Sequence, residues 1–410
     1  MDLARFFEEQ KTAQAAAPST PSILFVSHES SRTGAPIFLL RFLGWLKQRC
    51  ETPFRILVGS QGSLFQDFAA LAPTDSFEPL LSLSYRTLRK FNLHGSLATA
   101  HVAALKEKLL AAKIGLIYSN TFVNGSVLNF LSFLNCPVLC HVHELERAIL
   151  HFGAENEMLV KKYSSSYIAV SGAVRQNLIS NHGIPAEAVN VVHGFIPVVE
   201  SSEAFAVESR VAVREELRVR PDCKLICGCG SIEPRKGIDE FLFVAQKVLK
   251  DSHEDVHFFW VGGASGKVQN ASRQAVAMGI EDRVHFLGSR SDVNKYYAGS
   301  DIFFLSSIED PFPLVMMEAA LHALPVACFQ GSGGAPEFVA DDAGVIAPDF
   351  DLDAMAQKII HLLASPTLRR SLGCAGRQKV LDQFNLDVGS EKILSIIRRS
   401  LQATPRGNSY

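Results

Sequence analysis

The sequence lacks the features that mark a nucleic-acid binder, a membrane-spanning protein or a secreted protein. The formal net charge of the 410 residues is −2, whereas a dedicated nucleic-acid binder carries a strong basic excess. No apolar run reaches the roughly 18 residues that a spanning helix needs. Residues 1–20 hold no basic start followed by an apolar core, so a secretory signal is not expected. We therefore expect a cytoplasmic protein whose substrate is small or only locally anionic and is not a nucleic acid.

The cysteines do not have the spacing of a disulfide framework or of a zinc site. The eight cysteines lie mostly within expected strands, which is typical of reduced core thiols. Cys227 and Cys229 are separated by one residue, and the segment 136–143 carries two cysteines and two histidines. Neither group offers paired Cys-x2-Cys or His-x3-His spacing, and alternation along a strand turns Cys140 away from His141 and His143. We expect no disulfide bridge and no metal site.

The length and the hydropathy pattern predict two α/β domains. A chain of 410 residues exceeds the ~250 to 300 residues at which a single core stops growing. Short apolar runs alternate with helical patterns, and the same rhythm restarts after a polar stretch at 198–222. Such runs predict parallel strands in sheets that helices cover on both faces. The expected strands are 23–27, 54–59, 114–120, 138–143, 167–171 and 189–193, then 225–230, 257–263, 284–288, 302–306, 326–329 and 345–347.

These elements predict two doubly wound sheets in series. We place an N-terminal extension at 1–20, the first domain at 21–197, the second at 198–386 and a tail at 387–410, whose helix packs back on the first domain. Ligands of doubly wound sheets bind beyond the carboxyl ends of the strands, so two facing sheets predict a cleft between those edges. The unusual segments of this chain follow strands, where this rule requires a site.

A lone carboxylate within an apolar helix is the most informative candidate. From Leu314 to Leu324 nearly every residue is apolar except Glu318 and His322, which predicts a helix buried on most sides. Burying an ionised group without partners is costly, so Glu318 must accept hydrogen bonds from the protein or from a hydroxyl-rich ligand. Asp310 lies in the proline-rich loop that opens this helix, and that loop is a candidate phosphate or sugar cradle.

Two adjacent cations follow a strand of the second domain. Arg235 and Lys236 lie in the segment 230–237, before the apolar helix pattern at 238–249. Guanidinium, ammonium and amide donors at a helix entrance suit a diphosphate. The alternative is a solvated basic turn paired with Glu233.

The first domain offers a glycine at a helix entrance. The segment 27–36 joins a strand to a helix, with Thr33 as a cap, Gly34 open to a ligand and Pro36 in the first turn. This segment is not a P-loop, because the lysine and second glycine are missing, and it lacks the three-glycine dinucleotide fingerprint. We expect Gly34 to receive a phosphate from the opposite domain.

Polar residues follow two further strands of the first domain. His143 ends the strand that begins at Pro137, where it either donates to a sugar hydroxyl and shifts protons near pH 7 or bonds a backbone carbonyl. Asn120 and Asn124 lie in a loop after a strand. This loop either lines the acceptor side of the cleft or forms an ordinary turn.

Two further segments complete the candidates. Gly333 and Gly334 follow a strand and allow close backbone approach, and Glu337 either bonds a hydroxyl or favours the positive end of a helix. The segment 85–90 is the clearest basic patch of the first domain. It either faces an anionic lipid-linked acceptor or membrane surface, or it is a solvated helix face.

Taken together, these motifs resemble a known family, the retaining GT-B-fold nucleotide-sugar glycosyltransferases of glycosyltransferase family 4. The resemblance covers residues 23–397 and is strongest at 27–36, 230–239 and 307–338. Members carry Glu-x7-Glu, a Gly/Pro turn and Gly-Gly-x-x-Glu, and the similar residues here are Asp310, Glu318, Pro325, Gly333, Gly334 and Glu337. The resemblance implies two Rossmann-like domains facing a central cleft. It also implies transfer of a sugar from a nucleoside diphosphate sugar to an acceptor hydroxyl, in polysaccharide or glycoconjugate biosynthesis.

The resemblance also implies roles for single residues. Glu318 would hold the ribose hydroxyls of the donor, and Asp310 would lie beside the donor sugar, which His143 would contact. Arg235 and Lys236 would neutralise the diphosphate as charge develops on it, and they would act as catalytic residues with Asp310 and His143. The further donor-binding residues would be Gly34, Phe312, Leu314, Leu287, Gly333, Gly334 and Glu337, with Asn120 and Asn124 on the acceptor side.

Three departures distinguish this chain from the family pattern. Asp310 replaces the usual glutamate, Pro313 removes an amide donor, and Ser231 stands where many members have an arginine. The resemblance implies no cofactor and no metal, and a saccharide, lipid-linked or protein acceptor with peripheral contact at the inner membrane face. Two alternatives remain open: a GT-B sugar-nucleotide epimerase, and a catalytically silent nucleotide-sugar-binding subunit.

Overall fold

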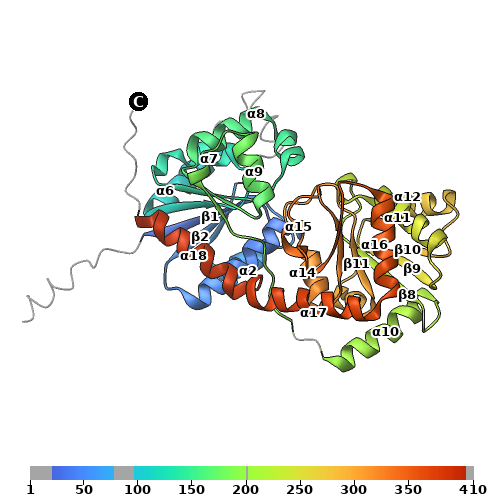
Figure 1. Ribbon diagram of the computed structural model, residues 1–410. Coiled ribbons are helices and arrows are strands. Elements are labelled where there is room, and N and C mark those ends of the chain that lie inside the picture. The colour runs from blue at the N-terminus through green and yellow to red at the C-terminus, as the bar shows by residue number, and fades with distance from the viewer. Residues whose placement is uncertain (1–20, 78–96, 200–201, 403–410) are drawn as a thin grey trace, which may run out of the picture.

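The structure is a computed structural model that describes residues 21–77, 97–199 and 202–402. Two parallel sheets, each flanked by helices, form two domains side by side (Figure 1). The extension at 1–20, the basic segment at 85–90 and the last residues of the 387–410 tail, 403–410, lie outside the described residues. The prediction of two doubly wound α/β domains is confirmed.

The first domain is built on a seven-stranded sheet in the order β3-β2-β1-β4-β5-β6-β7, with every strand pair parallel. The order reverses between β1 and β4, and a doubly wound sheet binds ligands beyond the carboxyl ends of its strands at such a switch point. The strands are β1 (Ser22–Glu29), β2 (Phe54–Ser60), β3 (Thr74–Ser76), β4 (Ile114–Ser119), β5 (Val138–Val142), β6 (Ser166–Ala169) and β7 (Val189–Val191). The helices are α2 (Gly34–Arg49), α3 (Phe65–Leu71), α6 (Leu97–Ala111), α7 (Gly125–Leu131), α8 (Glu146–Tyr163) and α9 (Gly172–Ser180), with 3-10 turns η1 (Ser132–Leu134) and η2 (Ala186–Ala188).

The second domain is built on a six-stranded parallel sheet in the order β10-β9-β8-β11-β12-β13. Its switch point lies between β8 and β11. The strands are β8 (Lys224–Cys229), β9 (Val256–Val261), β10 (Val284–Gly288), β11 (Ile302–Leu305), β12 (Val326–Phe329) and β13 (Gly344–Ala347). The helices are α10 (Glu203–Leu217), α11 (Ile238–Asp251), α12 (Ser265–Ala277), α13 (Val293–Gly299), α14 (Leu314–Leu321), α15 (Ala335–Val339), α16 (Leu352–Ala364), α17 (Pro366–Gln383) and α18 (Leu386–Gln402), with the 3-10 turn η3 (Pro234–Lys236).

Every expected strand is present, the structure adds two elements that were not expected, and one expected helix is shorter. β3 was not expected, because Thr74–Ser76 is short and polar. The polar stretch at 198–222 contains α10, an amphipathic helix that begins where Ser202 accepts a hydrogen bond from the Phe205 amide. α14 ends at Leu321 rather than at Leu324, because Ala323 adopts a left-handed φ of +57° and turns the chain toward β12.

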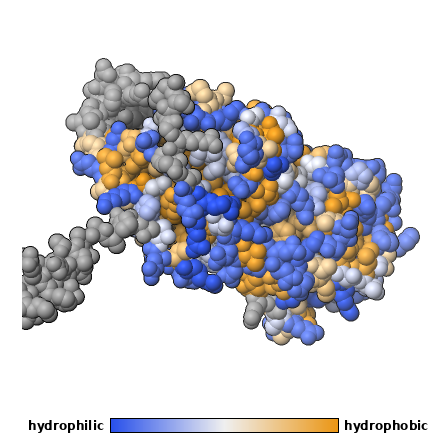
Figure 2. Space-filling view, turned by 60° about the vertical axis from the view of Figure 1, so that its left-hand side comes forward, coloured by the Kyte–Doolittle hydropathy of each residue, from blue (hydrophilic) through white to orange (hydrophobic). Residues whose placement is uncertain are grey.

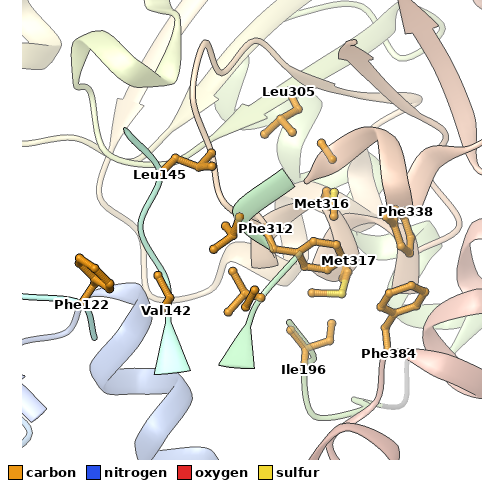
Figure 3. Packing of buried hydrophobic residues seen from close by; sticks show 14 of the residues in the cluster. Phe122, Val142, Leu145, Ile196, Leu305, Phe312, Met316, Met317, Phe338 and Phe384 are labelled. Atoms are coloured by element: carbon orange, nitrogen blue, oxygen red, sulfur yellow. The ribbon is translucent and has the colours of Figure 1, made fainter. Parts of the chain in front are cut away.

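One apolar cluster crosses from the first domain into the second. Val142 and Ile196 of the first domain belong to the same buried cluster as Phe312, Phe338 and Phe384, and Figure 3 shows these side chains converging. The Phe312 and Phe384 rings stack at 5.8 Å, and the Phe338 and Phe384 rings meet edge to face at 5.3 Å. Separating the domains would expose these apolar side chains to water at a cost of about 25 cal/mol per Å². The shared cluster therefore holds the two domains in a defined arrangement.

α18 leaves the second domain and lies along the first. Ile393 and Ile397 are buried in the cluster that also holds Phe42 and Trp45 of α2. The Trp45 indole donates to Asp387 at 2.7 Å, and Arg49 pairs with the same carboxylate at 3.0 Å. A second connection therefore joins the domains, and it runs beside the β7–α10 link, where the Ile196 amide donates to the Phe384 carbonyl at 3.0 Å.

Hydrophobic and hydrophilic residues are interspersed on the face shown in Figure 2. Among the described residues, no helix combines the length and the apolar character needed to cross a membrane. All eight cysteines fall within the described ranges, and each is a free thiol.

Candidate active site

The carboxyl edges of the two sheets meet. A side chain added at Gly333 would strike Leu145, which follows β5, and one at Gly334 would strike Ser171, which follows β6. Gly194, which follows β7, lies equally close to the Phe312 ring. The loops after the strands of both domains therefore face one another, as the predicted cleft requires.

Two loops of the second domain are fixed against each other by backbone contacts. The amides of Ile308 and Glu309 donate to the Arg235 carbonyl at 2.8 and 3.2 Å, and the Ser306 hydroxyl donates to the Lys236 carbonyl at 3.0 Å. Gly237 has a left-handed φ of +67° and leaves no room for a side chain against the Ser306 carbonyl. Only glycine allows this approach, so the basic loop after β8 is held against the loop after β11.

The two loops bring Lys236, Arg235 and Asp310 together. The Lys236 ammonium donates to Asp310 Oδ2 at 2.5 Å, and Arg235 Nη1 lies 3.9 Å from the same oxygen. Asp310 is buried at 5% exposure, and the Ser307 hydroxyl also donates to it at 3.4 Å. Arg235 Nε also lies 3.4 Å from Glu233 Oε2, so the pairing with Glu233 offered as the alternative is present and the two cations are balanced by two carboxylates. The Arg235 side chain is 41% exposed and can exchange these distant partners for an anion.

A third loop joins the same point. The Asp310 amide donates to the Ser332 carbonyl at 2.8 Å, and the Gly334 amide donates to the Asp310 carbonyl at 3.1 Å. Gly333 takes a φ of +108°, which only glycine adopts readily. The segments after β8, β11 and β12 thus converge, and Gly333 and Gly334 act here through backbone contacts.

The start of α2 is open on the first domain's side. A side chain added at Gly34 would meet no heavy atom within 4 Å. The side-chain Nδ2 of Asn120 donates to the Ala35 carbonyl at 2.8 Å and fixes this helix start. The prediction that Thr33 caps the helix is wrong, because its hydroxyl donates instead to Glu29 Oε1 at 2.8 Å.

His143 lies among aromatic rings at the end of β5. Its ring is 5.1 Å from Phe38 and 4.3 Å from His141, and its Nε2 is 3.3 Å from Asn120 Oδ1. Burial, with the neighbouring His28 as a second cause, lowers the pKa of His143 to about 3. The ring is therefore neutral near pH 7, and the prediction that His143 shifts protons there is corrected to a neutral hydrogen-bonding role.

Asn120 and Asn124 are interior residues. Both side chains are at most 1% exposed, and Asn124 donates to the Ser119 hydroxyl at 3.0 Å. Glu144 holds the same loop, since it accepts from the Thr121 hydroxyl and from the Phe122 and His143 amides. We correct the acceptor-side expectation, because these asparagines shape the loop from inside rather than line its surface.

Glu318 faces the first domain instead of a closed core. Its side chain is 29% exposed and lies 3.8 Å from Arg41 of α2. Burial raises the pKa of Glu318, although Arg41 acts in the opposite direction. The Glu318 carboxylate is therefore less buried than expected, and its counter-charge comes from α2, across the domain boundary.

Glu337 reaches into the first domain. Its carboxylate accepts from the Gly172 and Ala173 amides at 2.8 and 2.9 Å, at the start of α9, and from His193 Nε2 at 2.7 Å. Burial raises the pKa of Glu337, but the hydrogen bonds from His193 and the two amides outweigh burial and hold it below the usual value. Of the two interpretations offered for Glu337, this contact favours the positive helix end, at a helix of the opposite domain.

The remaining expected donor residues occupy different positions. The Phe312 side chain is buried 5.1 Å from the His193 ring, and Leu314 begins α14. Leu287 lies in β10, which β9 and β8 separate from β11, so it is about 14 Å from the loop after β11 at the usual strand spacing. Leu287 is therefore outside the Lys236–Asp310 cluster, at the edge of the second sheet.

Sequence reasoning missed two residues that face this region. Arg41 lies two turns after Gly34 on α2, and that helical spacing places both on one face. His193 lies two residues beyond β7, so the rule that sites follow strands could have found it.

The surface has two hollows, one of which lies between the domains. A cavity of about 500 Å³ between the domains is lined by Glu146, Gln176 and Glu309 among others. A larger hollow of about 620 Å³, lined by Ser22 and Lys113 among others, lies at the amino ends of β1 and β2, away from the cleft. Within residues 21–77, 97–199 and 202–402, no group of three or more His, Cys, Asp or Glu side chains is arranged to hold a metal ion.

Two family models and several curated proteins match the sequence. Residues 209–379 match the model described as Glycosyl transferases group 1, and residues 68–199 match that described as Glycosyltransferase Family 4. The GDP-mannose-dependent monoacylated alpha-(1-6)-phosphatidylinositol monomannoside mannosyltransferase of Corynebacterium glutamicum is 28% identical over 208 residues, 48% of this chain and 52% of that protein. The D-inositol 3-phosphate glycosyltransferase of Mycobacterium sp. strain KMS is 30% identical over 205 residues, 48% of this chain and 44% of that protein. The matches therefore span about half the length of these relatives.

Solved structures share the fold over most of the chain. Anabaena HepE, solved in complex with UDP and glucose, has a TM-score of 0.74 at 22% identity, covering 92% of this chain and 100% of that one. Sucrose-phosphate synthase from Thermosynechococcus elongatus has a TM-score of 0.73 at 20% identity, covering 94% and 100%. At such identities the likeness establishes the GT-B arrangement of two Rossmann-like domains. With the two family models, it follows that this chain belongs to the GT-B glycosyltransferases of the family 4 type.

Proposed function

We propose that the protein transfers a sugar from a nucleoside diphosphate sugar to an acceptor hydroxyl, with retention of anomeric configuration, in polysaccharide or glycoconjugate synthesis. The observation that carries the proposal is the cluster of Lys236, Arg235 and Asp310 at the switch point of the second sheet. The names of the curated relatives and the nucleotide complexes of HepE support a nucleotide-sugar donor.

The transfer balances without a metal or a protein nucleophile. The bond from the donor sugar's C1 to the diphosphate oxygen breaks, the acceptor oxygen bonds to C1 on the same face, and the acceptor proton passes to the leaving diphosphate. Asp310 is held by Lys236 and Ser307, which favours a positioning role beside the sugar over attack on C1. Front-face attack assisted by the leaving phosphate therefore accounts for retention.

The leaving diphosphate is stabilised by fixed positive charge. Arg235 is partly exposed beside Lys236, and preorganised cations stabilise charge that develops in the transition state. The open start of α2 at Gly34 supplies amide donors from the other domain. In this proposal the Arg41 side chain moves away from Glu318, which then accepts hydrogen bonds from the ribose hydroxyls. His143 contacts the transferred sugar as a neutral ring.

We also propose that the protein is cytoplasmic and associates peripherally with the inner face of the membrane. Leu150, Phe152 and Met158 of α8 are exposed apolar side chains, and Lys161 and Lys162 lie in the part of α8 after Gly153, where a non-helical φ of +84° kinks the helix. Such a pairing of apolar and basic groups favours peripheral contact with an anionic membrane that carries a lipid-linked acceptor.

A donor screen tests the proposed function. UDP-, GDP-, ADP- and dTDP-sugars are compared by thermal shift, since a ligand at about 100 times its Kd stabilises the native state by about 2.7 kcal/mol. The stabilising donor is then followed by proton NMR for hydrolysis and transfer, and the anomeric proton reports the configuration. We expect an α product from an α donor, and loss of turnover in Glu318→Ala combined with Lys236→Ala.

The control is Lys247→Ala, because Lys247 pairs with Asp353 on α16, outside the loops after the strands. This variant should keep full turnover. Neither transfer nor hydrolysis with any donor, or a β product from an α donor, would contradict the proposed function. Product formed from the donor alone by inversion at a sugar carbon would favour the epimerase.

A further inference from the structure

The cavity between the domains has a polar wall built from one helix face. Gln176, Asn177, Ser180 and Asn181 lie on successive turns of α9 and at its end, and all four line the cavity. The opposite wall comes from the second domain, from residues 308, 309, 330, 331 and 333. We call this space of about 500 Å³ the α9 cavity.

The α9 cavity adjoins the Lys236–Asp310 cluster. Glu309, which lines the cavity, directly precedes Asp310, and Gly333, which also lines it, forms a backbone bridge to Asp310. The Glu337 carboxylate holds the start of α9 against the second domain. A molecule in this cavity therefore lies next to the point where the proposed donor sugar is held.

The cavity wall can recognise hydroxyl groups. Carboxamides and hydroxyls offer both donors and acceptors, as sugar hydroxyls require. Gln176 Nε2 now donates to the Ser180 hydroxyl at 2.6 Å, and Asn181 Nδ2 donates to Asn177 Oδ1 at 2.8 Å. Gln176, Ser180 and Asn181 are exposed, so they can exchange these mutual bonds for bonds to a ligand.

The charge of the cavity opposes an anionic ligand. Its lining contains Glu146 and Glu309 but no lysine or arginine. Arg147, next in the chain to Glu146, is outside the lining, and its Nε lies 3.9 Å from Glu309. Phosphate recognition in proteins commonly uses arginine or lysine donors, which the lining lacks, and two carboxylates at the same site repel a phosphate.

We propose that the α9 cavity is the acceptor subsite and takes a neutral, hydroxyl-rich saccharide, while it excludes a sugar phosphate. This inference rests on the proposed function, because it assigns the cavity to the acceptor of that reaction. Carboxamides of α9 bind the acceptor hydroxyls, and Glu146 and Glu309 reject phosphorylated sugars.

Saturation-transfer NMR of the full-length protein tests acceptor choice directly. The probes are methyl α-glucoside, methyl α-mannoside and methyl α-galactoside, each compared with the corresponding 6-phosphate. We expect saturation transfer to at least one neutral glycoside. Titration followed by the same signal should give its 6-phosphate a Kd at least about tenfold higher, which corresponds to about 1.4 kcal/mol. Ser180→Lys places a cation in the cavity, and it should reverse that preference.

The matched control is Gln357→Lys, which adds the same charge at an exposed position of α16 in the second domain. It should leave the preference unchanged. A wild type that binds the phosphates better, that binds none of the probes, or whose preference Ser180→Lys does not alter, would overturn the inference. Thermal stabilisation by nucleotide sugars is measured on the same samples, so a failed acceptor subsite with intact donor binding is distinguished from failure of the proposed function.

Discussion

Glu337→Gln should release the start of α9 from the second domain. The carboxylate accepts three hydrogen bonds, from Gly172, Ala173 and His193, whereas a carboxamide has one oxygen and turns an N–H group toward the remaining donors. A hydrogen bond to a charged group contributes about 1.5 to 3 kcal/mol, and the low end applies because the side chain is 29% exposed. Losing most of this contact should cost about 2 kcal/mol, or about thirtyfold in the local opening equilibrium.

Hydrogen exchange measured at single amides is the direct assay. The Gly172 and Ala173 amides should exchange about thirtyfold faster in Glu337→Gln than in the wild type, since protection reports local opening. The control is Asp341→Asn, the same chemical change at an exposed residue shortly after α15. Unchanged protection of both amides in Glu337→Gln would refute the account of this contact.

The same contact should depend on pH in a defined direction. The folded-state pKa of Glu337 lies below its usual value of 4.5, so the stabilisation is fully present above that pH. It is lost as the pH falls through the folded-state pKa. Protection of the Gly172 amide, corrected for intrinsic exchange, should therefore fall in acid in the wild type and vary less in Glu337→Gln.

Three further predictions concern the cleft. His143, whose pKa is about 3, should stay neutral down to about pH 5 in ring-nitrogen NMR, and a ring titrating near its ordinary pKa of about 6.5 would contradict its burial. Gly34→Ala should leave the thermal midpoint unchanged but weaken donor binding by about tenfold in calorimetry. The control, Gly44→Ala in the same helix and equally unobstructed, should stabilise the protein by up to about 1 kcal/mol and leave donor binding intact. Equal effects of the two variants on donor binding would contradict the role of Gly34. Lys236→Met should destabilise the folded protein by about 3 to 5 kcal/mol in thermal unfolding, because Asp310 stays buried without its nearest partner. Adding Asp310→Asn to this variant should recover part of that loss. Additive losses in the double variant would contradict the proposed pairing of Lys236 with Asp310.

The strands were predictable because their signal is local. Continuous apolar runs such as Val256–Val261, which is buried throughout, announce a covered parallel strand without reference to the rest of the chain. Thr74–Ser76 carries no such signal, since it pairs at the sheet edge through its backbone. The end of α14 depends on the left-handed φ of Ala323, which the sequence does not predict because glycine and asparagine are the usual residues with this φ.

The site was predictable where its residues follow strands in the same domain. Lys236 and Asp310 were placed at neighbouring strand ends by the topology, and they form a hydrogen-bonded pair. The partners of Glu318 and Glu337 were not predictable, because Arg41 and the α9 amides come from the other domain. Their contacts depend on how the two domains are docked, and a single sequence contains no pattern that specifies this docking.

The central claim is that the cluster around Lys236 binds a diphosphate, and the most direct test compares nucleotides that differ by one phosphate. Calorimetry with UDP and UMP, or with the matching pair for the base selected in the donor screen, gives the contribution of the β-phosphate. Arg235 is partly exposed, so Arg235→Gln should keep the fold and the monophosphate affinity while it lowers diphosphate affinity by about tenfold or more. Equal losses for both nucleotides, or no loss for either, would contradict the assignment of this cluster to the leaving diphosphate.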